Sequence, residues 1–290
     1  PYSFIATSNA LIWNKLNPIF VDIEENSPNI DPLKIEASIT KNTSAILAVH
    51  CYGIPCNVKK LELIAKKHKL KLIYDAAHAF GVELNNKNIL NYGDLSILSF
   101  HATKVFNTFE GGAIISNDKK RIEFINQLKN FGFESEVQIN EIGINAKMSE
   151  INSAIGLAQI DYIDKVIIKR KNLTKLYYKN LNQISGLKFF EIENNVHYNY
   201  SYLPVQVLEG NKLTRDQLYE FLKNKNVFAR RYFYPLITNT IAYKEFKNSN
   251  KNSLLNAEKL ANRILCLPLY PSLKKREVNR ICKLIAGKLN

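Results

Sequence analysis

A chain of 290 residues can bury a full-sized core, and 46% hydrophobic with 23% charged residues is ordinary for a globular protein. No stretch approaches the roughly 20 uninterrupted apolar residues that span a membrane, and the first residues lack the basic and apolar regions of a signal peptide. The net charge of +14 makes nucleic acid a candidate partner, but the sequence has no zinc-finger spacing, RNP-like aromatic motif or long basic run, so we expect neither nucleic acid nor a membrane as partner.

The four cysteines, at positions 51, 56, 266 and 282, are too few and too scattered for a disulfide scaffold. Cys51 and Cys56 have a CxxxxC spacing that matches no common zinc site, so we expect no metal. Buried free thiols in a reducing cytoplasm are the prediction. The chain begins at Pro1 without an initiator Met and reads like the end of a strand, which predicts that upstream sequence is missing.

In chain order, short β-branched runs first alternate with helical patterns. Residues 58–69 carry apolar side chains at helical spacing, with lysines on the opposite face, which predicts an amphipathic helix. Strands joined by helices predict βαβ units and a largely parallel sheet with both faces covered, the α/β class. The strands are expected at residues 18–22, 45–50, 70–75, 95–100 and 112–116.

Two of these strands end in polar residues that a purely structural strand does not need. One ends at Asp75, shortly before His78, and the other contains Ser99 and leads to Lys104. Ligands of open α/β sheets bind beyond the carboxyl ends of the strands. We therefore expect Asp75, Ser99 and Lys104 to face one crevice.

The second half of the chain changes pattern. Residues 149–181 are helical, and a new unit begins near Gly186. Extended segments at 187–192 and 200–207 precede helices at 214–223 and 256–264, with Thr214 as an N-cap. We predict a large domain of residues 1–165 and a smaller α+β domain of residues 166–290.

Several segments together resemble the DegT/DnrJ/EryC1/StrS family, which are sugar aminotransferases of the fold-type I pyridoxal-phosphate class. No single motif is decisive, but their order and spacing extend over nearly the whole chain. The resemblance implies the fold-type I transferase fold and pyridoxal 5'-phosphate as cofactor. The family also has a small-residue turn, at a helix N-terminus, that holds the cofactor phosphate; it belongs to a segment upstream of Phe4. The motifs are FIATSN at 4–9, DAAHAFG at 75–81, SFHATK at 99–104, EGGA at 110–113, GIN at 143–145 and LPLYP at 267–271.

The resemblance assigns roles to three of the residues near the strand ends. Lys104 matches the lysine that binds the cofactor covalently and moves protons at the substrate carbon. Asp75 matches the carboxylate that keeps the cofactor ring nitrogen protonated, and His78 matches a position that contacts the phenolic oxygen or the lysine. The residues alone leave open a solvated surface lysine, a helix N-cap and a structural histidine.

The resemblance also implies further cofactor contacts. Ser99 matches a serine that donates to the phosphate, and Phe4 matches an aromatic that stacks on the ring. Asn145 matches an asparagine that reaches across a dimer to the partner subunit's cofactor phosphate. Packing or capping remains the alternative for each.

Residues 230–235 (RRYFYP) are similar to a stretch of the family's dTDP-sugar 4-aminotransferases, particularly those making dTDP-4-amino-4,6-dideoxyglucose. Arginines suit phosphate geometry, so Arg230, Arg231 and Tyr232 are candidates for binding the substrate diphosphate. Packing between the two domains is the alternative.

The activity implied is transfer of an amino group, from L-glutamate, to a nucleotide-linked keto sugar, dTDP-4-keto-6-deoxyglucose. This reaction serves deoxyamino-sugar and surface-polysaccharide (O-antigen) biosynthesis, in a cytoplasmic homodimer with shared active sites. Another nucleotide-sugar 3- or 4-aminotransferase remains an alternative, as does a catalytically inactive or regulatory relative. A sugar dehydratase of the same fold carries His in place of the lysine, so Lys104 argues against that activity.

Overall fold

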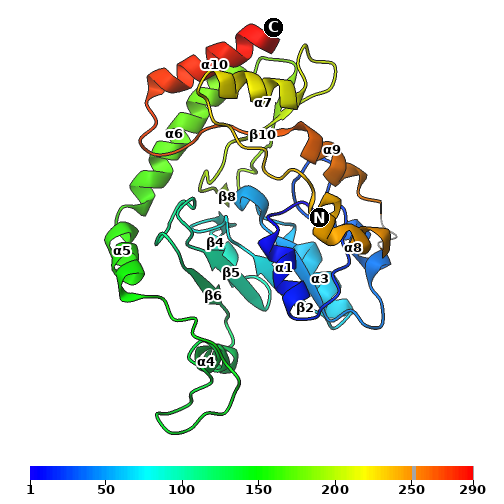
Figure 1. The fold of residues 1–290 in the computed structure, drawn as a ribbon, viewed down its shortest axis with the longest axis vertical. Helices are drawn as coiled ribbons and strands as arrows, with labels where there is room; N and C mark the ends of the chain where they lie inside the picture. Colours follow the sequence, from blue (N-terminus) through cyan, green and yellow to red (C-terminus); the bar gives the residue numbers. More distant parts are fainter. Residues whose placement is uncertain (250–252, 290) are drawn as a thin grey trace.

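The computed structural model describes residues 1–249 and 253–289, and its centre is a four-stranded sheet (Figure 1). The strand order is β1-β2-β5-β6. β1 pairs with β2 and β2 with β5 in parallel, whereas β6 runs antiparallel to β5. The predicted α/β class with a largely parallel sheet is confirmed. The strands are β1 (Ala45–Val49), β2 (Lys71–Asp75), β5 (Leu95–Ser99) and β6 (Gly112–Ile115).

Helix α3 (Val58–Lys67) follows the predicted amphipathic pattern. The side chain of Asn57 accepts a hydrogen bond from the backbone N–H of Lys60 at 3.2 Å and so caps the first turn. Leu61 and Ala65 are buried with side chains of β1 and β2 in one apolar cluster. The helix therefore covers one face of the sheet, as the βαβ pattern requires.

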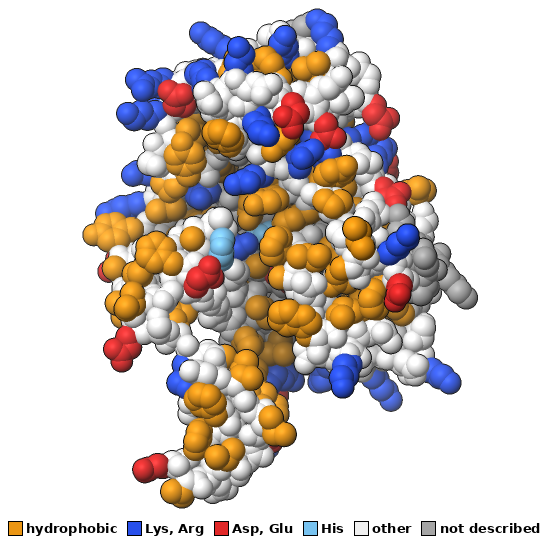
Figure 2. Space-filling view, in the orientation of Figure 1, with side chains coloured by type: hydrophobic (Ala, Val, Ile, Leu, Met, Phe, Trp, Pro, Cys, Tyr) orange, Lys and Arg blue, Asp and Glu red, His pale blue; other side chains and the backbone are white. Residues whose placement is uncertain are grey.

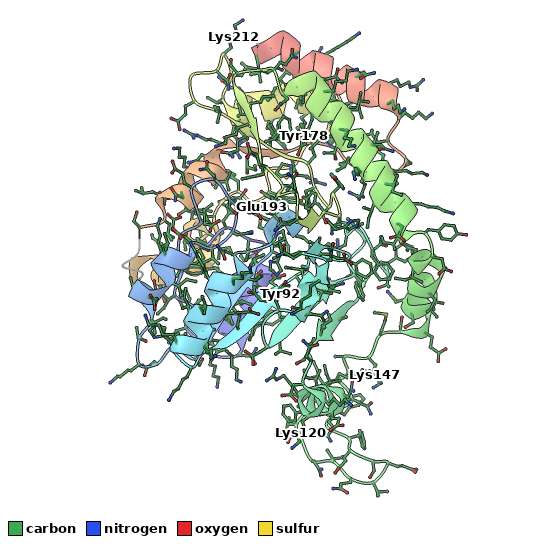
Figure 3. The ribbon with its side chains drawn as sticks, turned by 180° about the vertical axis from the view of Figure 1, so that it is seen from behind. Tyr92, Lys120, Lys147, Tyr178, Glu193 and Lys212 are labelled. Carbon is green, nitrogen blue, oxygen red and sulfur yellow. The ribbon has the colours of Figure 1, made fainter. Side chains whose placement is uncertain are left out.

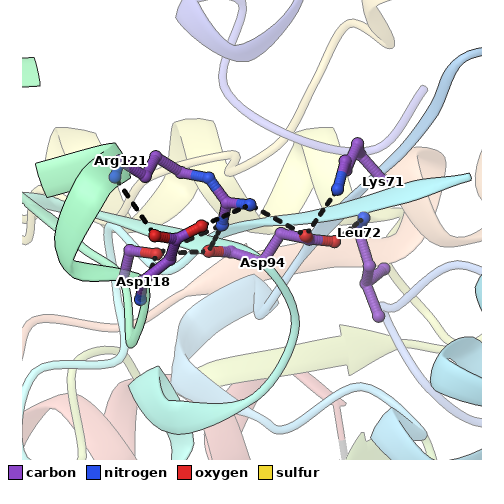
Figure 4. A network of polar contacts seen from close by, with 6 residues as sticks. Lys71, Leu72, Asp94, Asp118 and Arg121 are labelled. Atoms are coloured by element: carbon purple, nitrogen blue, oxygen red, sulfur yellow. Dashed lines mark hydrogen bonds and ion pairs between the residues drawn. The ribbon is translucent and has the colours of Figure 1, made fainter. Parts of the chain in front are cut away.

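A polar network ties together the starting ends of β2 and β5 (Figure 4). The Asp94 carboxylate, just before β5, accepts the backbone N–H of Leu72 at 2.9 Å and lies 3.3 Å from both Lys71 Nζ and a guanidinium nitrogen of Arg121. Partial burial alone would raise the pKa of Asp94, but these donors hold it below its ordinary value.

At the other end of the same two strands, Asp75 of β2 lies opposite Ile97 of β5. The carboxyl ends of β2 and β5 therefore meet at one edge of the sheet.

The prediction of a strand at residues 18–22 is wrong. These residues form no ladder, and the nearest pairing is an isolated bridge between Ile23 and Ile30. The buried Asp22 carboxylate instead accepts the backbone N–H groups of Asn256 and Ala257, at 3.1 and 2.9 Å. The segment therefore caps the start of helix α9 (Leu255–Arg263), a partner more than 230 residues away.

The helical pattern of residues 149–181 is confirmed but holds two helices. These are α5 (Glu150–Ile160) and α6 (Ile163–Leu181), which a short turn separates. The hydroxyl of Ser149 accepts the backbone N–H of Asn152 and caps α5. Neither proline nor glycine occurs at the break, so the sequence gives no local signal for it.

Between β6 and α5 the chain forms a projection, which comprises α4 (Lys119–Leu128) and the loop up to Met148. Figure 1 shows it extending away from the sheet, and Figure 3, seen from behind, places the labelled Lys120 and Lys147 on it. Few of its side chains pack into a core, because only Gly132 is buried among residues 119–148.

A second sheet organises the later half of the chain, with the antiparallel order β10-β9-β7. Helices α6, α7 and α10 enclose one apolar cluster together with this sheet. Thr214 caps α7 in a capping box with Gln217, so the predicted N-cap is confirmed. The predicted extended segments and helices are found, whereas β10 was not predicted. The division at residue 165 stays a prediction. The elements are β7 (Leu187–Phe189), β9 (Pro204–Val207), β10 (Ile264–Cys266), α7 (Arg215–Asn224) and α10 (Lys275–Leu289).

The remaining elements are short, and among them β3 pairs with β8 of the later half of the chain. Within the described residues, no helix is both long and apolar enough to span a membrane, and no group of three or more His, Cys, Asp or Glu side chains is placed to hold a metal ion. All four cysteines are free and buried. The short elements are α1 (Ala6–Trp13), α2 (Pro32–Ile35), α8 (Lys244–Ser249), β3 (Glu83–Leu84), β4 (Lys87–Asn88) and β8 (Val196–His197).

Candidate active site

Asp75 is the last residue of β2, and two hydrogen bonds orient its carboxylate. One oxygen accepts the backbone N–H of Ala77 at 3.0 Å, and the other accepts the hydroxyl of Thr7 at 2.6 Å. The first bond closes a turn rather than capping a helix, since no helix begins there. Both carboxylate oxygens are thus fixed at the carboxyl edge of the sheet.

Lys104 reaches the same edge from the loop after β5. Its backbone N–H donates to the carbonyl of His101 at 2.9 Å, which closes a turn. Burial lowers the pKa of the Lys104 ammonium group, and the Asp75 carboxylate acts through space in the opposite direction. A lysine with a lowered pKa is neutral more of the time, and only a neutral amine can attack a carbonyl carbon.

His78 is buried beside them. Its Nδ1 accepts the backbone N–H of Tyr52 at 3.0 Å, so the neutral ring carries its proton on Nε2. Burial holds the pKa of His78 well below its ordinary value, and the positive charge of Lys104 lowers it further. The ring lies parallel to that of Phe233, at 5.9 Å between centroids, and edge-on to Tyr202 at 4.8 Å. His78 is therefore a fixed, uncharged donor.

The structure brings Asp75, His78, Ser99 and Lys104 to one edge of the sheet. Ser99 ends β5 two residues beyond Ile97, the partner of Asp75, and its hydroxyl accepts the backbone N–H of His101 at 3.4 Å. Figure 2 shows basic, histidine and acidic side chains close together in the hollow at the middle of this face. The arrangement joins an amine, a carboxylate, a neutral imidazole and a hydroxyl.

Two other predicted contacts lie outside this group. Phe4 is 57% exposed and precedes α1, and its carbonyl accepts the backbone N–H of Thr7, the residue that holds Asp75. Asn145 is exposed on the projection, where its backbone bridges to Asn130. Among the described residues no hydrogen bond links Asn145 to the other candidate site residues.

Residues 230–235 were candidates either for binding the substrate diphosphate or for packing, and their side chains differ in which role the structure favours. Arg230 is exposed, and its backbone pairs with Cys266. Arg231 forms an ion pair with Asp216 at 2.8 Å and lies over the Tyr219 ring, which favours packing for this side chain. Tyr232 lies against the aromatic group around His78, with its ring 6.0 Å from that of Tyr202.

Sequence reasoning missed two residues that organise the site. Thr7 lies in the FIATSN motif but received no role, and only its contact with Asp75 reveals one. Tyr52, in the 3-10 turn Cys51–Gly53, donates its backbone N–H to His78. A signal existed for Tyr52, because it follows the carboxyl end of β1 at the same sheet edge as Asp75 and Ser99.

Comparison with known proteins identifies relatives over nearly the whole chain. A profile of the DegT/DnrJ/EryC1/StrS aminotransferase family matches residues 1–286. The dTDP-4-amino-4,6-dideoxy-D-glucose transaminase of Shigella dysenteriae is 48% identical over 273 residues, covering 94% of this chain and 74% of the relative. The Escherichia coli protein of the same name is 46% identical over 292 residues, covering 100% of this chain and 78% of the relative.

Solved structures agree with these relatives. The crystal structure of DesI in the presence of its TDP-sugar product superposes with a TM-score of 0.91 at 34% identity, covering 98% of this chain and 72% of that chain. The predicted fold and the predicted aminotransferase activity are thereby confirmed. The chain belongs to the DegT/DnrJ/EryC1/StrS aminotransferase family.

Proposed function

We infer that this chain transfers an amino group from L-glutamate to dTDP-4-keto-6-deoxyglucose, with pyridoxal 5'-phosphate bound through Lys104. The meeting of Lys104, with its lowered pKa, and the oriented Asp75 carboxylate is the observation that carries the proposal. The relatives that are 46% and 48% identical, both named for a dTDP-4-amino-4,6-dideoxy-D-glucose product, support the choice of sugar.

The side chains at the sheet edge fit this cofactor, and the family and its solved homologues are pyridoxal-phosphate-dependent aminotransferases. Lys104 would hold it covalently, Asp75 would face the ring nitrogen and Ser99 would donate to the phosphate. His78 would donate from Nε2 to the phenolic oxygen, and Phe4 would cover the ring face. When bound, the cofactor supplies an electron sink for the substrate carbon.

The chain's own residues supply positioning and proton transfer. Thr7 and Ala77 hold the Asp75 carboxylate in a single orientation, so it can keep a proton on the facing ring nitrogen. The Lys104 amine, neutral more often because of its burial, can take a proton from the substrate carbon and return it. His78 stays uncharged, so it donates a hydrogen bond without adding a second positive charge beside Lys104.

The proposal includes a homodimer in which Asn145 completes the partner subunit's site. Large apolar side chains of the projection and α5 are exposed, and contiguous exposed apolar patches mark surfaces that another molecule covers. A two-fold axis would place this surface of one subunit against the same surface of the other. Phe4, just before α1, and Trp13, at the end of α1, are also exposed, at 57% and 84%. The exposed apolar residues of the projection and α5 include Val137 at 92%, Ile142 at 100%, Ile144 at 69%, Ile151 at 76% and Leu157 at 74% (Figure 2).

The proposed compartment is the cytoplasm. The four cysteines are free and buried, and Cys51, Cys56 and Cys266 have pKa values that burial raises well above the ordinary thiol range. Such thiols are poor nucleophiles and persist as thiols in a reducing compartment.

A product assay tests the proposal. The protein is incubated with pyridoxal phosphate, L-glutamate and each of a panel of dTDP-, UDP- and GDP-linked 3- and 4-keto sugars, and the products are identified by mass spectrometry. We expect amination of dTDP-4-keto-6-deoxyglucose, its loss in Lys104→Ala, and its retention in Lys66→Ala, a control lysine exposed on α3. Faster amination of a UDP or GDP sugar, or of a 3-keto sugar, would contradict the proposed substrate.

A further inference from the structure

Tyr52 is fully buried and joins three separate parts of the chain. Its backbone N–H donates to His78, its backbone carbonyl accepts the hydroxyl of Tyr198 at 2.9 Å, and its own hydroxyl donates to the carbonyl of Tyr232. Its φ is +59°, a left-handed conformation that non-glycine residues adopt only where their surroundings require it. Here that conformation permits all three contacts at once.

The hydroxyl contact fixes residues 230–235 at a single point. The Tyr232 carbonyl accepts from Tyr52 and also from the hydroxyl of Tyr2, at 3.2 Å for the latter. The backbone N–H of Phe233 donates back to the Tyr2 oxygen at 3.3 Å. The hydroxyls of Tyr2 and Tyr52 thus provide the hydrogen-bond partners of the backbone at the centre of this segment. Tyr52 is fully buried, so its hydroxyl cannot bond to bulk water instead.

Parallel aromatic rings connect Tyr52 to His78 in the candidate site. The Tyr52 ring lies parallel to the Phe233 ring, with 6.0 Å between centroids and 8° between planes. The Phe233 ring in turn lies parallel to His78, with 5.9 Å and 4°. A shift of the backbone at Tyr232 therefore moves the ring that covers His78.

We propose that Tyr52 is a positioning residue, whose hydroxyl seats residues 230–235 against His78 and thereby shapes the pocket for the nucleotide sugar. The inference rests on the proposed function for the identity of that substrate. In this role Tyr52 contacts neither substrate nor cofactor. It acts through Tyr232 and Phe233.

The substitution Tyr52→Phe isolates the hydroxyl, because the ring and the backbone N–H donated to His78 are kept. Tyr177→Phe is the matched control: Tyr177 is also fully buried, and its hydroxyl donates to the carbonyl of Pro268 at 3.0 Å within the later half of the chain. Both variants lose one buried hydroxyl-to-carbonyl bond, and Tyr52→Phe also loses the hydrogen bond between the Tyr52 and Tyr2 hydroxyls, so it should lose at least as much stability as the control. Only Tyr52→Phe should disturb the site.

The kinetic readout separates the two substrates. In Tyr52→Phe we expect KM for the nucleotide sugar to rise roughly tenfold, because the Tyr232 carbonyl loses one of its two hydroxyl donors, while KM for glutamate stays within about twofold. In Tyr177→Phe neither KM should change. An equal change of both KM values in Tyr52→Phe, or the same change in the control, would overturn the inference.

Hydrogen exchange supplies a readout that needs neither substrate nor turnover. Peptides covering residues 230–235 should exchange faster in Tyr52→Phe than in wild type, and at the wild-type rate in Tyr177→Phe. Unchanged exchange in Tyr52→Phe would overturn the inference whatever the kinetics. Absence of amination of every nucleotide sugar by wild type would instead overturn the proposed function, and exchange would still decide the role of Tyr52.

Discussion

Thr7 donates its hydroxyl hydrogen to the Asp75 carboxylate at 2.6 Å, across 68 positions of sequence. The bond joins helix α1 to the carboxyl end of β2. Because the second Asp75 oxygen is held by the backbone of Ala77, the carboxylate has no freedom to turn away from the crevice. The residue that would face the cofactor ring nitrogen is thus positioned by a helix that lies outside the sheet.

The first prediction concerns this pair. If Asp75 keeps the ring nitrogen protonated, Asp75→Asn should lower kcat by more than about tenfold, or 1.4 kcal/mol of barrier, because an amide does not hold that proton. Thr7→Val keeps the carboxylate and removes only its orienting bond, so its loss of kcat should be smaller. Turnover of Asp75→Asn within tenfold of wild type, with the fold intact by circular dichroism, would remove Asp75 from this role.

The second prediction concerns Lys104 and its dependence on pH. Burial lowers its pKa and Asp75 partly restores it, so Asp75→Asn should lower the pKa further. The rate at which pyridoxal phosphate attaches, followed by its visible absorbance, should therefore reach its plateau at lower pH in Asp75→Asn than in wild type. Borohydride reduction should leave the pyridoxyl group on the peptide that contains Lys104. A label on Lys147, or a plateau shifted to higher pH, would contradict the assignment.

The strands and their chemistry could be predicted because both depend on local pattern. β-branched runs ending in Asp75 and Ser99 predict buried parallel strands and a polar edge, and the family motifs add the roles of the residues. The same reasoning failed at residues 18–22, whose Ile19, Phe20 and Val21 read as a strand. The conformation of this segment depends on the hydrogen bonds between Asp22 and the start of α9. That partner is distant in sequence, so no local pattern predicts it.

The place of Tyr52 at the sheet edge could be predicted, but its contacts could not. A left-handed tyrosine is set by the surrounding packing rather than by residue type, since sequence favours glycine or asparagine at such φ values. Its neighbour Gly53 does carry a visible reason: a Cβ at Gly53 would lie 2.7 Å from the carbonyl oxygen of His78. The sequence therefore shows a tight turn after β1, but not what the turn holds.

The third prediction concerns stability at low pH. Burial lowers the pKa of His50 to about 3 and, with Lys104 adding repulsion, holds that of His78 well below 6.5. In the unfolded chain both rings bind protons near pH 6.5, whereas in the folded chain they stay neutral. Stability should therefore be complete above about pH 6.5 and fall below it, by about 1.4 kcal/mol per pH unit for each histidine.

Urea unfolding at a series of pH values between 7 and 4 measures this slope. His50→Gln removes one titrating ring outside the candidate site and should reduce the slope by about 1.4 kcal/mol per pH unit, because the carboxylates that titrate in the same range cancel in the comparison. Parallel curves for wild type and His50→Gln would show that His50 is not buried as a neutral ring.

The fourth prediction concerns the apolar surface of the projection and α5. If a second subunit covers it, light scattering should give twice the 33.3 kDa of one chain. Ile142→Glu and Ile151→Glu should shift the protein toward monomer, because each would bury an unpaired charge at the contact. Leu33→Glu, at a 78% exposed position on α2, is the control and should remain a dimer. A monomeric wild type with full activity would defeat the proposed assembly.

The fifth prediction tests whether the two subunits share their sites. In the proposed dimer each site takes Lys104 from one chain and Asn145 from the other, so Lys104→Ala and Asn145→Ala, inactive or impaired alone, should complement each other. After random subunit exchange half of the dimers are mixed, and each mixed dimer has one intact site of two, so about a quarter of wild-type activity should appear. Mixing Lys104→Ala with Asp75→Asn gives no such recovery, because both residues belong to the same chain's site and every mixed dimer keeps one defect in each site. No recovery in the first mixture, after exchange is verified by mass spectrometry, would place Asn145 outside the partner's site, since only a residue that acts across the subunit contact can complement in trans. Recovery in the second mixture would instead show that Lys104 and Asp75 serve sites of different chains.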